Sequence, residues 1–276
     1  MKLNKQKYFY LISGLPDISL QDAYVPFSAK IFLDELKNKI DNEDFALVCM
    51  LYYIKDNHNL LDILFNKNNT LKPEGYYSLA DLKKSVDGNV LLPQYMNDFI
   101  TSFREDKNSY TEAEWEFKLT EAYFRAAQKT ENEFLNQWME FELNLKNLML
   151  VMSNRKQELP FSEIILEANE MAELMKENPA ADFSTQPCID FMNQVVQIIE
   201  TENLIERERK VDALRWKKVE EMTFFNYFTI EAILSFIIKL MILERWNMLK
   251  QLQEKEFLSS ILKSFTKKIK IPHAVN

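Results

Sequence analysis

Apolar residues are densest between Met222 and Leu252, in a stretch without glycine or proline. They occur all round the helical repeat, and a helix that is apolar on every side must be covered on nearly every side. The pattern therefore predicts a central helix inside a multi-helix body. A membrane span is the alternative, because about 20 apolar residues can cross a bilayer. Glu231 and Lys239 argue against it, since each would cost roughly 2.5–3.5 kcal/mol at the bilayer centre.

The rest of the chain is also mostly helical in pattern, because apolar residues recur every three or four positions after Pro26. Before that, the apolar run Tyr8–Ile12 is too short to distinguish a strand from a buried helical turn. We expect about ten helices in all. One is the central helix, and another is a long helix from Glu112 that is described below. The others are a helix capped by Ser28 that carries Ile31 to Ile40, a helix capped by Asp41 or Asn42 that carries Phe45 to Tyr53, and helical segments near Asn59–Phe65, Ser78–Ser85, Pro93–Phe103, Ser162–Lys176, Cys188–Ile199, Glu200–Lys218 and Glu256–Lys270.

One predicted helix is much longer than the others. Thr111 and Glu114 have the spacing of a capping box, which satisfies two free N–H groups at a helix start. No glycine or proline follows until Pro160. A continuous helix from Glu112 to about Asn154 would be on the order of 60 Å long at 1.5 Å per residue. We therefore expect an elongated molecule with long helical hairpins.

The segment Asn178–Pro187 is rich in residues that interrupt helices, and it is our candidate for a boundary between lobes. We accordingly divide one structural unit into an N-terminal helical region, a long helical hairpin and a C-terminal region around the central helix. These regions are residues 1–110, 111–177 and 178–276.

Composition narrows the class of protein. The chain has three glycines, all far apart, whereas loops that bind nucleotide phosphates need clustered glycines. Few glycines also favour an all-α fold over a sheet-rich one. The net charge of −8 argues against broad nucleic-acid binding. From Arg245 to Asn276, however, seven basic and two acidic residues give a net charge of +5, which we interpret as a solvated last helix that could also contact an anionic partner or lipid headgroups.

Histidine and cysteine residues that could act in catalysis or bind a metal are scarce. We therefore expect a protein that is not an enzyme and holds no cofactor or metal. His58 and His273 are isolated, whereas zinc and di-iron sites need grouped ligands. Cys49 and Cys188 are too few for a disulfide framework, and no signal peptide is evident. A reducing cytoplasm is the expected compartment. The clustered aromatic residues are interpreted as core: Trp115, Tyr123, Phe124, Trp138 and Phe141.

Two stretches carry a family resemblance. The segment 144–148, Asn-Leu-Lys-Asn-Leu, follows a bulky apolar helix and precedes Arg155. It resembles a motif of the C-type central-stalk component of the V/A-type ATPases, which is called the d-type component in eukaryotes, with Asn144 where that family commonly has aspartate. The opening segment, YFYLISGLP, resembles that of an uncharacterised bacterial family encoded with V-type ATPase subunits.

The second stretch lies on the central helix. It resembles the last conserved segment of the same C/d-type family, in which a Phe-x-x-Glu-x-x-Leu helix leads to Glu-x-x-Asn-Leu. The matching residues are Phe228, Glu231, Leu234, Phe236, Glu244 and Asn247, and Met248 replaces the final leucine.

The resemblance implies a funnel-like, non-catalytic component of the central stalk. Such a protein seats the D and F subunits of the stalk on one face and rests on the membrane rotor ring of K (or c) subunits with the other. It would transmit torque between ATP hydrolysis or synthesis and the transport of protons or sodium ions. Its place would be the cytoplasmic face of the inner membrane, as a peripheral protein. A soluble helical scaffold or assembly factor is the main alternative, and an enzyme that uses acidic residues is a more distant one.

The polar residues of both motifs have two possible roles. Asn147 and Asn247 lie on otherwise apolar helices, where a buried amide must find hydrogen-bond partners. Glu142 and Glu244 precede them and could accept from those amides or from a neighbouring helix. Clamps between helices within the fold are favoured over direct contacts with a partner protein.

Overall fold

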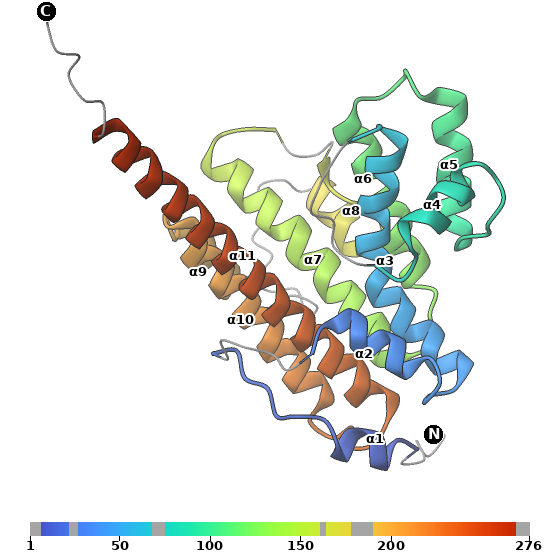
Figure 1. Ribbon diagram of the computed structural model, residues 1–276. Coiled ribbons are helices and arrows are strands. Elements are labelled where there is room, and N and C mark those ends of the chain that lie inside the picture. The colour runs from blue at the N-terminus through green and yellow to red at the C-terminus, as the bar shows by residue number, and fades with distance from the viewer. Residues whose placement is uncertain (1–6, 22–26, 68–74, 161–163, 178–189, 269–276) are drawn as a thin grey trace, which may run out of the picture.

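The computed structural model describes residues 7–21, 27–67, 75–160, 164–177 and 190–268, with side chains up to Lys250. These residues form eleven α-helices and no strand, which confirms the all-α prediction. Two neighbouring long helices, α10 (Leu204–Thr223) and α11 (Ile230–Lys268), form a hairpin (Figure 1). Against this hairpin packs α7 (Glu133–Lys156), and α9 (Met192–Glu200) contacts both α7 and α10.

The other end of the body is built from four helices. The long α3 (Asn42–Leu64) packs on α4 (Leu79–Val86) and on α6 (Glu112–Ala127), and α5 (Gln94–Asp106) packs on α6. Three short helices complete the fold: α1 (Phe9–Ser13), α2 (Ala29–Leu36) and α8 (Glu170–Glu177). In the described residues, no helix has both the length and the apolar character needed to cross a membrane.

The buried apolar residues form two clusters. The main core surrounds α7, α10 and α11 and also includes the first half of α3 and most of α2. The smaller core lies between the second half of α3, α4, α5 and the start of α6. One helix belongs to both cores, because α6 contributes Trp115 to the small core and Phe124 to the main one. All five aromatic residues assigned to the core are buried: Trp115, Tyr123, Phe124, Trp138 and Phe141.

The predicted long helix from Glu112 to Asn154 is wrong as a continuous element. The helix ends at Ala127, and α7 begins after Asn132, whose side chain accepts a hydrogen bond from the Leu135 N–H at 2.9 Å. On the other side of the turn, the Asn136 amide donates to the Gln128 carbonyl at 2.8 Å. These two amides satisfy backbone groups that a helix break exposes. The turn therefore needs neither glycine nor proline.

The central helix is buried as predicted, but its boundaries differ. The apolar run from Met222 is divided between the end of α10, a turn at 224–229 and the start of α11. At the turn, the Thr223 hydroxyl donates to the Val219 carbonyl at 2.7 Å, and the Asn226 N–H donates to the Thr223 carbonyl at 2.9 Å. At its other end, α11 continues to Lys268, so the separate helix expected near Glu256–Lys270 is part of α11.

Several smaller predictions can also be compared with the structure. Ser28 and Ser78 cap α2 and α4, and the capping box of Thr111 and Glu114 is confirmed. The predicted piece Asn59–Phe65 is the end of α3, and the ambiguous run at Tyr8–Ile12 is helical. The helix expected from Ser162 begins at Glu170, with the Asn169 side chain accepting from the Ala172 N–H at 3.0 Å. The following positions lie outside the described residues: Ser162, Asn178–Pro187, Cys188 and His273.

Candidate functional site

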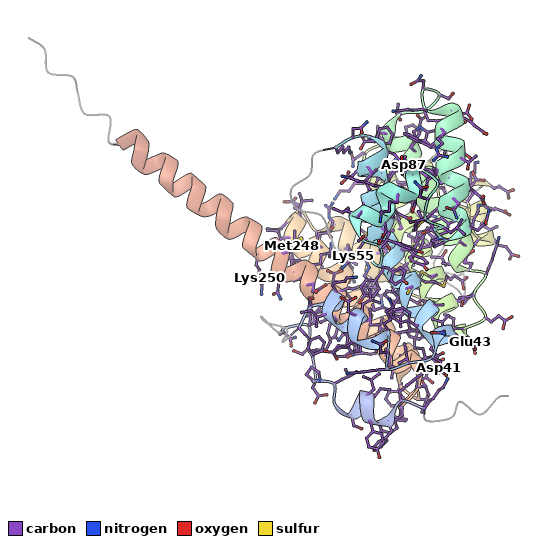
Figure 2. The ribbon with its side chains drawn as sticks, turned by 45° about the vertical axis from the view of Figure 1, so that its right-hand side comes forward. Asp41, Glu43, Lys55, Asp87, Met248 and Lys250 are labelled. Carbon is purple, nitrogen blue, oxygen red and sulfur yellow. The ribbon has the colours of Figure 1, made fainter. Side chains whose placement is uncertain are left out.

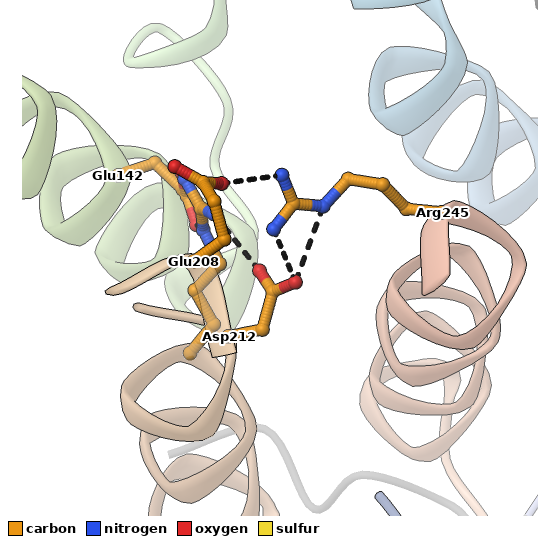
Figure 3. A network of polar contacts seen from close by, with 5 residues as sticks. Glu142, Glu208, Asp212 and Arg245 are labelled. Carbon is orange, nitrogen blue, oxygen red and sulfur yellow. Dashed lines mark hydrogen bonds and ion pairs between the residues drawn. The ribbon is translucent and has the colours of Figure 1, made fainter. Parts of the chain in front are cut away.

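The most extensive polar feature is a chain of ion pairs between α7, α10 and α11 (Figure 3). Its centre is Asp212 on α10, a carboxylate whose side chain is only 1% exposed. Asp212 accepts from Arg215 at 3.0 Å and from Nε of Arg245, on α11, at 3.1 Å. Arg215 in turn binds both carboxylate oxygens of Glu142, on α7, at 2.7 and 3.0 Å. Arg245 also donates to Glu208 at 2.7 Å.

The carboxylates of the network stabilise the charged forms of its two arginines. Burial disfavours the charged form of Arg215, but the carboxylates of Glu142 and Asp212 outweigh that effect and raise its pKa. The pKa of Arg245 is raised in the same way, with Asp212 and Glu208 opposing the effect of burial. Two-pronged arginine–carboxylate pairs also fix orientation. The arrangement therefore suits a rigid connection between three long helices, and its carboxylates are already engaged by guanidinium groups.

Sequence reasoning found Glu142 but missed the other members of the network. The alternating charges from Glu200 to Lys218 favour a solvated helix face, yet Asp212 is buried within this run. A signal was present, because Asp212 precedes Trp216 by four residues and Val219 by seven, which places it on the apolar stripe of the helix. A charged residue on such a stripe needs a charged partner.

The motif residues Asn144 and Asn147 are both buried on α7. The Asn147 amide makes two hydrogen bonds of 3.0 Å to the backbone of Leu166, donating to its carbonyl and accepting from its N–H. The Asn144 side chain accepts from the Asn169 amide at 2.9 Å. These contacts hold the segment that leads into α8 against α7, and α8 begins directly after Asn169.

The motif residues of α11 have different surroundings. The buried Glu231 accepts from Asn132, the cap of α7, at 2.9 Å. Glu244 accepts from the Ala29 N–H at the start of α2 at 2.6 Å, and its other oxygen lies 3.7 Å from Nζ of Lys55 on α3.

Asn247 is the exception among the motif residues. Contrary to the expectation of a buried amide, its side chain is half-buried, and it makes no hydrogen bond within the described part of the chain. It lies two residues beyond Arg245 of the ion-pair network, next to the exposed Met248.

Glu142 and Glu244 are also partly exposed, but both are engaged within the fold, by Arg215 and by the Ala29 N–H. Of the six motif residues, Asn247 is therefore the partly exposed one whose side chain is most available to a partner protein.

A separate open cleft of about 730 Å³ lies along α5 and α6. Six of its eighteen lining residues are aromatic, and others are acidic or basic. Nζ of Lys118 lies 4.0 Å from the centre of the Tyr110 ring, so part of the cleft's positive charge already interacts with a ring. None of the six motif residues lines this cleft.

A buried carboxylate, Asp56, lies on α3 between the two cores. Burial raises its pKa to about 7, although the N–H groups of Tyr76 and Tyr77 donate to it at 3.0 and 3.1 Å. Gly75 is required beside it, because a Cβ there would overlap the carboxyl group. Asp56 does not line the open cleft, so it does not combine with the cleft carboxylates into an acid–base site. Within the described ranges, no three His, Cys, Asp or Glu residues are placed to hold a metal ion.

The fold and these contacts define a class: an all-helical protein whose longest helices are joined by buried ion pairs and amide clamps. The chain belongs to the family described as "Protein of unknown function (DUF2764)", whose family model matches residues 5–269. A comparison with curated proteins finds no match.

Proposed function

We propose that this protein is a non-catalytic central-stalk component, of the C/d type, of a bacterial V/A-type ATPase. The observation that supports this most strongly is the link between the two motif stretches. Glu142, beside the first motif, connects through Arg215 and Asp212 to Arg245, which lies within the second. The helices that carry the two resembling stretches are thus joined by ion pairs, although the stretches lie far apart in the sequence.

In this role the protein transmits torque between the rotating stalk and the rotor ring. Such a role requires a body that is stiff along its long helices. Close-packed interiors resist deformation, and the ion pairs oppose sliding of α7, α10 and α11 past one another. Beyond Lys250, α11 extends clear of the body (Figure 2). At 1.5 Å per residue, the part from 251 to 268 adds about 27 Å of helix. Such an arm would give one partner a lever at the end opposite α1.

In this proposal the partners are the D and F subunits of the stalk on one face and the ring of K (or c) subunits on the other. The protein would act without cofactor or substrate, at the cytoplasmic face of the inner membrane. Asn247 and Met248 are accessible beside the rigid network, so they are the first positions at which we expect contact with a partner.

The test is affinity purification of the tagged protein from its native host in mild detergent, with mass spectrometry and an untagged strain as control. Recovery of the D and F subunits together with the ring protein would support the proposal, and cross-links from position 247 would identify the partner at that face. Recovery of a soluble complex without any ATPase component would overturn it and favour the scaffold or assembly-factor alternative.

A further inference from the structure

At one end of the body, α1 lies beside the turn between α10 and α11 (Figure 1). These two segments carry five exposed aromatic side chains. We call this group the aromatic tip. Its most exposed members are Tyr10 and Phe225, with exposed fractions of 92% and 81%. All five are exposed by half or more of their surface: Phe9, Tyr10, Phe224, Phe225 and Tyr227.

The fold holds the tip in place, because a hydrogen bond and a ring contact join two segments that are distant in the sequence. The Tyr8 N–H donates to the Phe228 carbonyl at 3.1 Å, and the rings of Phe9 and Phe228 lie 4.6 Å apart. In the turn itself, the Phe224 and Phe225 rings pack at right angles with centres 4.8 Å apart. The fold thus holds the rings outward in place of burying them.

The exposed aromatic surface is large for a protein of this size. At about 200 Å² for each ring, the exposed fractions amount to roughly 700 Å². The largest apolar patch on a typical monomer is about 300–600 Å² and often functional. A surface of this size and composition indicates that the tip is buried in an apolar environment when the protein functions.

The tip also lacks charge, although the protein as a whole does not. No acidic or basic residue occurs in Tyr8–Pro16 or in Met222–Ile230. The nearest base in the sequence, Lys7, is paired with Asp41 and Asp44. The polar groups within the tip are hydroxyls and an amide, whereas the net charge of the whole chain is −8.

We propose that the aromatic tip inserts into the interfacial layer of a lipid bilayer. Phenylalanine and tyrosine bury their rings there while hydroxyl and amide groups stay at headgroup level. An uncharged tip on an acidic body fits a zwitterionic surface better than an anionic one, because anionic lipids would repel the body. A second copy of the chain fits less well, since a stable interface needs about 800 Å² per partner and the tip is a single turn beside one short helix at the end of the body.

The inference concerns lipid alone and does not depend on the ATPase assignment, so each can fail without the other. The experiment is sedimentation of the full chain with phosphatidylcholine vesicles over a range of lipid concentrations. We expect Phe224→Ser/Phe225→Ser to lower the partition coefficient at least tenfold. The matched control is Leu91→Ser, which removes an apolar side chain that is 87% exposed between α4 and α5 and should leave binding unchanged.

Salt and lipid charge sharpen the test. Binding through the tip should be unaffected by raising NaCl from about 50 to 500 mM, and it should not increase when phosphatidylglycerol is added. Absence of binding to phosphatidylcholine, or equal binding by the double variant, would overturn the proposal. Binding that requires anionic lipid and is lost at high salt would also overturn the proposal. Such binding would show that the basic C-terminal segment, and not the aromatic tip, contacts the lipid. If only a protein partner is lost with the double variant, the tip occupies a protein socket and not a bilayer.

Discussion

The two cores of the molecule are held together in different ways. The small core is closed by apolar contacts, with the rings of Phe99 and Phe103 at 5.5 and 5.1 Å from that of Trp115. The main core contains the buried Asp212, Asn144 and Asn147 together with apolar residues. Its helices are long, and α7 and α11 carry apolar residues over many turns, so several registers of these two helices would bury similar areas. We infer that ion pairs and amides select one register there. In the small core, aromatic packing predominates, and a hydrogen bond of 3.0 Å from the Tyr95 hydroxyl to Asn57 also links α5 to α3.

The largest loss of stability should come from Trp115→Ala in the small core. Removing a buried tryptophan leaves a cavity and costs about 3–5 kcal/mol. Urea unfolding should show this loss, and hydrogen exchange should show α4 and α5 opening before α7 and α10. The control is Tyr110→Ala, which removes a half-exposed ring that packs on Trp115 and should cost far less. A loss below about 1.5 kcal/mol would mean that the aromatic contacts do not hold this core.

A comparable loss, from a different cause, is expected for Arg215→Ala in the main core. The change leaves Glu142 without its partner and Asp212 with Arg245 alone, and breaking a buried ion pair costs about 3–5 kcal/mol. We expect about 3 kcal/mol, because the Arg215 side chain is a quarter exposed. Lys217→Ala, two residues away, breaks an exposed pair with Glu221 and should cost less than about 1 kcal/mol. Equal effects of the two variants would contradict the proposed role of the network.

A smaller loss is expected for Asn147→Leu. The substitution leaves the Leu166 N–H buried and unpaired, while the Leu166 carbonyl keeps only its bond from the Ala168 N–H. This loss should cost about 2 kcal/mol in a thermal or urea melt. Asn247→Leu is the matched control, because the same change is made at a half-buried amide, and it should alter stability by less than about 0.5 kcal/mol. If Asn247 contacts a partner, pull-downs with that variant should lose the partner while its melt stays unchanged. An unchanged result in both assays for both variants would contradict the significance of the motifs.

The same contrast explains which features the sequence could predict. Helices in and beside the small core begin at Ser78 and Thr111, whose spacing to the next polar residues is a local signal. In the main core, the only local signal for the break at Asn132 is the asparagine itself, a favoured N-cap residue. Asparagine also occurs within helices, so the uninterrupted apolar pattern outweighs this signal in a prediction from sequence. A structural role for Glu142 could be predicted, because it is an acidic residue among the apolar residues that precede the first motif. Its partner Arg215 was not, because pairing across 73 positions depends on tertiary packing that local periodicity does not contain.

The smallest expected change in the free energy of unfolding comes from the titration of Asp56. This residue lies where α3 passes from one core to the other. Burial raises its pKa from 3.8 to about 7, against the opposing effects of the Tyr76 and Tyr77 N–H groups, Lys30 on α2 and Lys55 on α3. The folded state therefore holds a proton that the unfolded chain releases, so stability is greatest below pH 4 for this group and falls as pH rises towards 7. At 1.36 kcal/mol per pKa unit, the loss between pH 6 and 8 is about 1 kcal/mol. Urea unfolding at both values should show this loss relative to Asp56→Asn, which cannot titrate. The same slope in both proteins would show that Asp56 is already ionised at pH 6, and that its two backbone donors outweigh its burial.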